Sequence, residues 1–199
     1  MISRKLILAS ASPRRRELLS LICPDFEVLP SEFDESNMPS DLPPMDHVVM
    51  SAKEKAMDVA AKVTDGIVIG SDTVVSIDEH ILGKPQDERD AARMLRMLSG
   101  RTHQVYTGIH VIDVRRNERR ERSGFECTDV CFRELTDGMI ERYIATGEPM
   151  DKAGAYAIQG RGSVLIKGIS GCYFNVVGLP VYKLGLILEE SGLEALTCR

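Results

Sequence analysis

The stretch LILASASPRRRE, residues 6–17, decides how the first part of the chain folds. Leu6–Ala9 is a short apolar run typical of a buried strand. Ser10 and Ser12 follow as candidate helix N-caps, and Pro13 suits a first helical turn, where its missing N–H costs nothing. The order of residue types therefore predicts a strand that leads directly into a helix, with the helix N-terminus at the exit of the strand.

The turn at residues 10–14 has the features of an anion-binding site. Unpaired N–H groups of a first helical turn and the positive end of the helix dipole both favour a bound anion. The hydroxyls of Ser10 and Ser12 and the guanidinium of Arg14 would donate to the same phosphate. An ordinary strand-to-helix turn with solvated arginines is the alternative, and the rest of the chain has to decide between the two.

Composition excludes several classes of protein. The chain has 199 residues, a net charge of −5 and no tryptophan, which suits one domain or two lobes around one cleft. Since no apolar run approaches the ~20 residues that span a bilayer, we expect no membrane segment and a cytoplasmic location. Neither a basic face nor a set of stacking aromatic residues is evident, so a small nucleotide is expected rather than a nucleic acid polymer.

Strand-like and helix-like segments alternate along the chain without repeats, which is typical of the α/β class. A loop at 31–44, rich in proline, serine and acids, interrupts the alternation, and loops of this length in compact domains tend to be functional. Asp87 and Thr136 are candidate N-caps. The predicted strands are 6–9, 26–29, 67–77, 104–113, 122–132 and 163–169, and the predicted helices are 13–21, 46–62, 87–98, 136–146 and 180–190.

Asp72 lies in the middle of the almost continuous apolar run IVIGSDTVV, residues 67–75. A buried carboxylate is costly unless it is paired, hydrogen-bonded or bound to a metal. In open α/β sheets an acid at the end of a strand lies where ligands bind. Asp72 is therefore a candidate metal ligand or general base. An aspartate that merely caps a turn fits less well, because Val74 and Val75 continue the strand pattern.

Three lysines are candidates for binding phosphate. Lys84 lies between Gly83 and Pro85 at the foot of a strand, where it could reach a phosphate or simply face solvent. Lys53 and Lys55 lie on opposite edges of the apolar stripe of the 46–62 helix, about 80° from its centre at about 100° per residue. Helical geometry does not choose between these two.

Gln159 ends the turn-rich segment EPMDKAGAYAIQ, residues 148–159. Its amide both donates and accepts hydrogen bonds, so it could read the edge of a nucleotide base. A solvated loop around a core Tyr156 is the alternative.

Six stretches, which span nearly the whole chain in order, together resemble the Maf family of septum-formation-inhibitor-related nucleoside triphosphate pyrophosphatases. They are LASASPRRREL (8–18), GSDTVV (70–75), LGKP (82–85), LSGRTHQVYTG (98–108), GEPMDKAGAYAIQG (147–160) and NVVGLP (175–180). The resemblance implies one domain over 1–199, with a mixed, elongated, twisted sheet, flanking helices and two lobes around a central cleft, as in inosine triphosphatase. It also implies hydrolysis of a nucleoside triphosphate to the monophosphate and pyrophosphate with a divalent cation, Mg²⁺ or Mn²⁺.

The resemblance also implies roles for individual residues. Asp72 corresponds to the proton acceptor and, with Glu35, to a metal ligand, although Asp34 is an alternative to Glu35 in the variable loop. The catalytic lysines on the phosphate side correspond to Lys55 and Lys84. Substrate contacts are expected from Ser10, Ser12, Arg14, Thr73 and Gln159, whereas Arg15 and Arg16 are expected to form salt bridges or face solvent.

The motif DKAGAYAIQG, residues 151–160, resembles the corresponding segment of the subgroup that acts on dTTP and UTP. A pyrimidine nucleotide is therefore the expected substrate, and a homodimer is compatible with the resemblance. The alternative from another class is a nucleotide-binding regulator of septum formation that acts through protein partners. A Rossmann dinucleotide binder is disfavoured, because no G-x-G-x-x-G follows the first strand.

Overall fold

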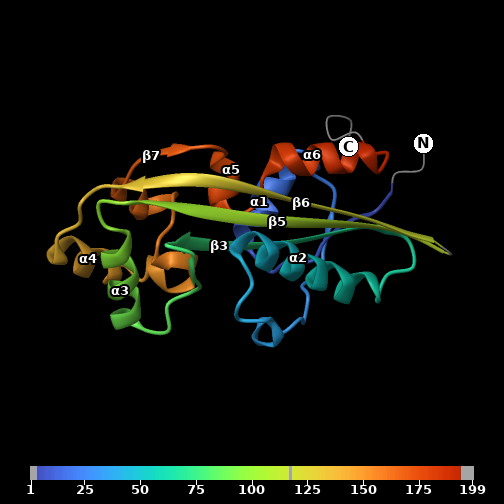
Figure 1. The fold of residues 1–199 in the computed structure, drawn as a ribbon. Coiled ribbons are helices and arrows are strands. Elements are labelled where there is room, and N and C mark those ends of the chain that lie inside the picture. The colour runs from blue at the N-terminus through green and yellow to red at the C-terminus, as the bar shows by residue number, and fades with distance from the viewer. Residues whose placement is uncertain (1–3, 117, 194–199) are drawn as a thin grey trace. The chain divides into compact units, whose positions relative to one another are not determined.

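The protein is described by a computed structural model that covers residues 4–116 and 118–193 (Figure 1). Seven strands of this part of the chain form one sheet in the order β2-β1-β3-β5-β6-β7, with β4 paired to β3. Their bounds are β1 Leu6–Leu8, β2 Glu27–Val28, β3 Gly66–Ile77, β4 His80–Leu82, β5 Thr102–Arg115, β6 Glu118–Phe132 and β7 Ile166–Ser170. The sheet is mixed, because β1 is parallel to both β2 and β3 whereas β4 and β7 are antiparallel to their partners. The predicted α/β class is confirmed.

The helices are α1 Pro13–Ser20, α2 Pro44–Ala60, α3 Glu88–Leu98, α4 Asp137–Ile144, α5 Tyr173–Val177 and α6 Val181–Glu190, with short 3₁₀ segments at Glu35–Asn37, Glu148–Asp151, Ala153–Ala155 and Gly160–Leu165. Helices α1 to α4 each lie between two strands in the sequence, whereas α5 and α6 follow the last strand, β7. Within residues 4–116 and 118–193, the structure contains no helix long and apolar enough to cross a membrane.

The chain divides into two compact units, which agrees with the two lobes expected. Unit 1 comprises Met1–Asp72, Thr107–Glu126 and Gly178–Arg199, and unit 2 comprises Thr73–Tyr106 and Cys127–Val177. Strands β3, β5 and β6 each contribute one segment to unit 1 and one to unit 2. Asp72 is the last residue of the unit 1 segment of β3.

In unit 1, helix α2 packs directly on two neighbouring strands through glycines. A Cβ added at Gly70 of β3 would overlap the carbonyl oxygen of Ala52 and lie 2.8 Å from the amide nitrogen of Ala56. A Cβ added at Gly108 of β5 would lie 2.8 Å from the amide nitrogen of Val49. The backbone of α2 therefore touches the sheet itself, and the buried side chains of α2 pack around this contact.

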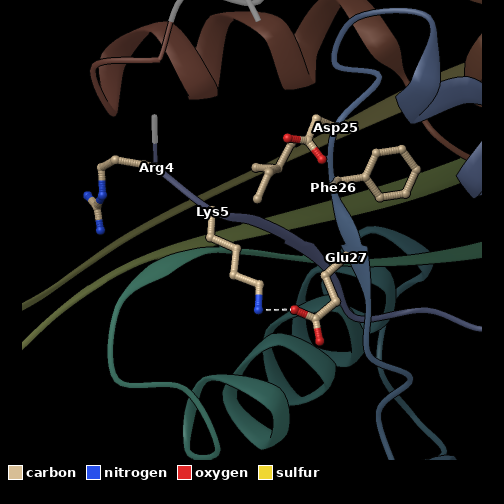
Figure 2. A pocket seen from close by; sticks show the side chains of 6 residues that line it. Arg4, Lys5, Asp25, Phe26 and Glu27 are labelled. Carbon is tan, nitrogen blue, oxygen red and sulfur yellow. Dashed lines mark ion pairs between the residues drawn. The ribbon is translucent and has the colours of Figure 1, made fainter. Parts of the chain in front are cut away.

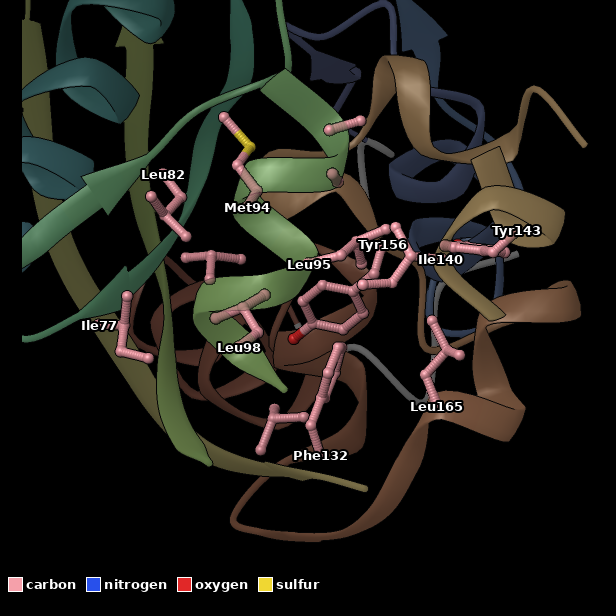
Figure 3. Close-up of a cluster of buried hydrophobic side chains, with 14 of the residues drawn as sticks. Ile77, Leu82, Met94, Leu95, Leu98, Phe132, Ile140, Tyr143, Tyr156 and Leu165 are labelled. Atoms are coloured by element: carbon pink, nitrogen blue, oxygen red, sulfur yellow. The ribbon is translucent and has the colours of Figure 1, made fainter. Parts of the chain in front are cut away.

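The core of unit 2 is built around α3 and the aromatic side chains of β6 and its neighbours. Leu95 and Leu98 of α3 point toward Phe132 and Tyr156 (Figure 3). His103, which is fully buried, joins this cluster: its ring lies edge-on to Phe132 and its Nε2 is 2.8 Å from the hydroxyl of Tyr156. The core thus encloses an ionisable imidazole.

The stability of the protein should fall on acidification because of His103. Burial lowers the pKa of His103 to about 4, with Asp129 acting weakly in the opposite direction. Between pH ~6.5 and ~4 the unfolded chain binds a proton that the folded chain does not, so about 3 kcal/mol of stability is lost over this window. Urea unfolding at a series of pH values measures this loss.

His103→Gln provides the control for that series. The variant keeps a polar partner for Tyr156 but does not titrate, so its free energy of unfolding should depend less on pH than that of the wild type. Burial also lowers the pKa of His110, and its contribution is common to both proteins. Identical pH dependence of the two proteins would contradict the assignment to His103.

Several predicted elements differ in extent from the observed ones. The strand predicted at 163–169 begins only at Ile166, because Gly160–Leu165 winds into a 3₁₀ helix that starts at a glycine with φ of +68°. Helix α5 was not predicted; it is only five residues long and lies between Gly171 and Gly178, both with positive φ. Short elements of this kind carry too few residues for a periodic pattern.

Candidate functional site

In unit 1, Asp72, Lys55 and Glu35 form a cluster of charged side chains. Asp72 is 6% exposed, and the Nζ atom of Lys55 lies 2.7 Å from its Oδ1. The same Nζ lies 2.7 Å from Oε1 of Glu35. The charge of the buried carboxylate is therefore partnered, as burial requires, and two carboxylates meet at one ammonium group.

The local packing explains why Lys55 and not Lys53 reaches Asp72. Ala52 and Ala56 of α2 contact Gly70, which lies two residues before Asp72 on β3. Lys55 therefore projects from the turn of α2 that lies directly on the sheet. Lys53 instead pairs with Glu121, at 3.8 Å. The choice that helical geometry left open depends on this tertiary contact.

The acidic loop presents Glu35, and not Asp34, to Lys55. Asp34 caps the 3₁₀ segment Glu35–Asn37: its Oδ1 accepts from the amide of Ser36 at 2.9 Å, and this hydrogen bond lowers the pKa of Asp34. The start of the loop is held by Asp58 of α2, which accepts from the amide of Glu32 at 2.8 Å. The loop is thus attached to the helix that carries Lys55.

The opening turn has the predicted strand-to-helix order and the predicted Ser12 N-cap, but Arg15 lies differently from the expectation. Ser12 is the N-cap of α1, and its hydroxyl accepts from the amide of Arg15 at 3.4 Å. The Arg15 side chain turns inward, where its Nε donates to the carbonyl of Gly178 at 2.9 Å and its Nη1 donates to Ser10 Oγ at 3.3 Å. Arg14 is half-buried and Arg16 is exposed.

The electrostatics of Arg15 connect this turn to the carboxylates. Burial lowers the pKa of Arg15, the charges of Asp72 and Glu35 act to raise it, and Arg14 acts to lower it. The charges of Arg14, Asp72 and Glu35 thus all act on the guanidinium of Arg15. A triplet of identical residues contains no signal that tells which side chain turns inward, so the sequence could not have identified Arg15.

His47 is a second residue that the sequence analysis missed. It lies on α2, about two turns before Lys55, and its Nδ1 is 3.8 Å from Oδ2 of Asp72. The sequence signal was its position on the helix that carries Lys55, but nothing in the pattern indicated that this part of α2 also faces Asp72.

Three of the predicted residues belong to unit 2. Thr73 and Gln159 are half-buried and Lys84 is exposed. The amide of Gly154 donates to the carbonyl of Gly83 at 3.0 Å, so the turn that carries Lys84 is joined to the glycine-rich segment that ends at Gln159. Within unit 2, the structure thus links two sequence segments about 75 residues apart that were predicted independently.

A cavity of about 500 Å³ lies elsewhere in unit 1 (Figure 2). It is lined by Arg4, Lys5, Leu6, Asp25, Phe26 and Glu27, with an ion pair between Lys5 and Glu27. None of the predicted site residues lines it.

The fit of a divalent cation can be judged from the carboxylates. Among residues 4–116 and 118–193, no three His, Cys, Asp or Glu side chains are grouped as a complete metal site. Glu35 and Asp72 nevertheless converge on one nitrogen, and Mg²⁺ typically uses one or two carboxylates together with substrate phosphates and water. The donor set therefore fits a cation that arrives with its nucleotide.

Comparisons with known proteins identify relatives over almost the full chain. A dTTP/UTP pyrophosphatase of Clostridium botulinum (strain Kyoto / Type A2) is 48% identical over 96% of this chain and 99% of that protein. A dTTP/UTP pyrophosphatase of Moorella thermoacetica is 52% identical over 96% of each. A solved nucleoside-triphosphatase (dITP/XTP pyrophosphatase) from Mycobacterium abscessus aligns with 98% of this chain and 100% of its own, at 13% identity and a TM-score of 0.43.

The family model described as Maf-like protein matches residues 5–191. This match includes all six stretches that carried the resemblance, from the opening turn to the residues before α6. The chain belongs to the Maf family.

Proposed function

We propose that this chain hydrolyses dTTP and UTP to the nucleoside monophosphate and pyrophosphate. The observation that carries the proposal is the buried Asp72, held at 2.7 Å by Lys55, which also contacts Glu35. A protein that only binds nucleotide has no need for a buried carboxylate in this setting. The choice of pyrimidine substrates is supported by the names of the two relatives at 48% and 52% identity.

In the proposed reaction, Asp72 orients a water molecule and takes its proton as the water oxygen bonds to the α-phosphorus. The bond from that phosphorus to the bridging oxygen breaks, and pyrophosphate leaves with the electron pair. Lys55 holds the carboxylates of Asp72 and Glu35 at one point, while Ser10, Ser12, Arg14 and the N-terminus of α1 bind phosphate oxygens. Catalysis then depends on positioning and charge.

The remaining roles are part of the same proposal. Glu35 and Asp72 would hold Mg²⁺ or Mn²⁺, which when bound offsets the negative charge of the phosphates. Lys84 would bind phosphate, and Thr73 and Gln159 would contribute to the choice of base. Residues 1–199 would act as one domain, a proposal supported by a family match that crosses both compact units. A homodimer and a cytoplasmic location stay predictions.

A product assay tests the proposed function. The protein is incubated with dTTP, UTP, CTP and the purine triphosphates in the presence of Mg²⁺ or Mn²⁺, and pyrophosphate and phosphate are measured separately. We expect one pyrophosphate per dTTP or UTP consumed and no free phosphate. Phosphate alone would mean that the wrong bond has been assigned, and no product from any nucleotide would favour the regulator that acts through partners.

A further inference from the structure

The loop that carries Gln159 is closed at both ends by two side chains of unit 2. Tyr143 of α4 accepts a hydrogen bond from the amide of Ala157 at 3.2 Å and donates one to Oε1 of Glu148 at 2.8 Å. Oε1 of Glu148 also accepts from the amide of Gly162 at 2.8 Å. One hydroxyl and one carboxylate therefore join the start of the loop to its end.

The second oxygen of Glu148 strengthens this closure. Its Oε2 accepts from the amide of Arg161 at 2.9 Å. Burial acts to raise the pKa of Glu148, but the amides of Arg161 and Gly162 and the hydroxyl of Tyr143 outweigh it, so the net shift is downward. Hydrogen bonds to an ionised carboxylate are about twice as strong as those between neutral groups.

The backbone of the loop fits closely around these two side chains. Gly160 has a φ of +68°, and a Cβ there would lie 2.6 Å from Oε2 of Glu148. A Cβ at Gly162 would lie 2.6 Å from the hydroxyl of Tyr143. Because only glycine fits at both positions, the loop is built around the Tyr143–Glu148 pair, and Gln159 lies in the span between its attachment points.

An amide that reads a base edge needs this kind of fixed support. Discrimination against a wrong base arises when a fixed polar group is left without a partner, and a mobile side chain avoids that penalty by moving. The hydrogen bonds above go to the backbone on either side of Gln159 and do not involve its side-chain amide, so they restrict the loop while the amide remains the group that meets a base.

We propose that Tyr143 and Glu148 are positioning residues that fix Gln159 and thereby set which nucleotide base the enzyme accepts. The inference rests on the proposed function. It assigns to the pair an effect on base choice and not on the chemical step, since the groups proposed to act on phosphorus lie on other segments of the chain.

Steady-state kinetics of Tyr143→Phe, Glu148→Gln and Gln159→Ala test the inference with UTP and CTP, whose bases differ in hydrogen-bonding pattern. For Tyr143→Phe and Glu148→Gln we expect the UTP:CTP ratio of kcat/KM to fall about 10-fold through KM, with kcat on UTP changed less than about 2-fold. Tyr173→Phe, an exposed tyrosine of the same unit, should leave the ratio unchanged.

A double variant separates positioning from general structural support. If Tyr143 acts through Gln159, adding Tyr143→Phe to Gln159→Ala should not lower the ratio further. A ratio that stays at the wild-type value in both single variants, or a KM that rises equally for both nucleotides, would overturn the inference while the proposed function stands. No pyrophosphate from the wild type with any nucleotide would overturn both. Thermal unfolding identifies a variant that fails to fold, and Tyr143→Phe, which removes a single oxygen, then carries the test.

Discussion

Replacing Asp72 by asparagine is expected to lower the turnover of dTTP and UTP by about 10³-fold, within the ~10²–10⁴-fold range of a general base. Asparagine has nearly the same size, and its amide oxygen can still accept from Lys55, which contacts Asp72 at 2.7 Å. It cannot take a proton from water. The fold should survive, so pyrophosphate release and thermal unfolding are measured on the same preparation.

Asp113→Asn is the matched control for this experiment. Asp113 is another buried aspartate of unit 1, but it pairs with Arg4 and Arg115 and not with Lys55. Removing its charge leaves two arginines with a weaker partner, so stability should fall while kcat of the folded protein stays near the wild-type value. Wild-type turnover by Asp72→Asn would remove Asp72 from the catalytic role.

Replacing Gly70 by alanine should destabilise the protein by ~4 kcal/mol, above the usual ~1–3 kcal/mol for overpacking. The excess is expected because the new methyl group would meet backbone atoms, the carbonyl of Ala52 and the amide of Ala56, and not flexible side chains. Helix α2 would have to move away from β3 and would carry Lys55 away from Asp72. We therefore expect activity to be lost together with stability, as measured by urea unfolding and pyrophosphate release.

Gly185→Ala serves as the control within the same unit. Gly185 lies in α6, and a Cβ added there meets nothing within 4 Å. Alanine is favoured over glycine in helices by ~1 kcal/mol, so this variant should be slightly more stable and fully active. If Gly70→Ala unfolds at the same urea concentration as the wild type, the close contact between α2 and β3 is not as described.

Features that depend on neighbouring residues in the sequence were predictable. Ser12, Asp87 and Thr136 were expected as N-caps, and each accepts a hydrogen bond from the amide three residues later. The placement of Asp72 within a buried strand followed from its apolar neighbours. Local patterns of this kind determine both the cap and the strand, so no tertiary information was needed.

Features that depend on distant contacts were not predictable. Arg15 is held by the carbonyl of Gly178, and Glu148 by the amides of Arg161 and Gly162. Strand β6 also begins at Glu118, earlier than the predicted 122–132 segment, because the extent of a strand depends on its neighbours in the sheet, here β5 and β7. In each case the partner is specified by the fold or by the pairing of neighbouring strands, and a single sequence does not show either.

The two glycines beneath α2 also bear on how freely this protein can be altered. Where side chains separate a helix from a sheet, an added methyl group can be accommodated, because those side chains can repack. At Gly70 and Gly108 no side chains lie between helix and sheet, and the backbone of α2 contacts β3 and β5 directly. Substitutions chosen to raise stability are therefore best directed to other surfaces, and the tolerance of these two positions to change should be among the lowest in unit 1.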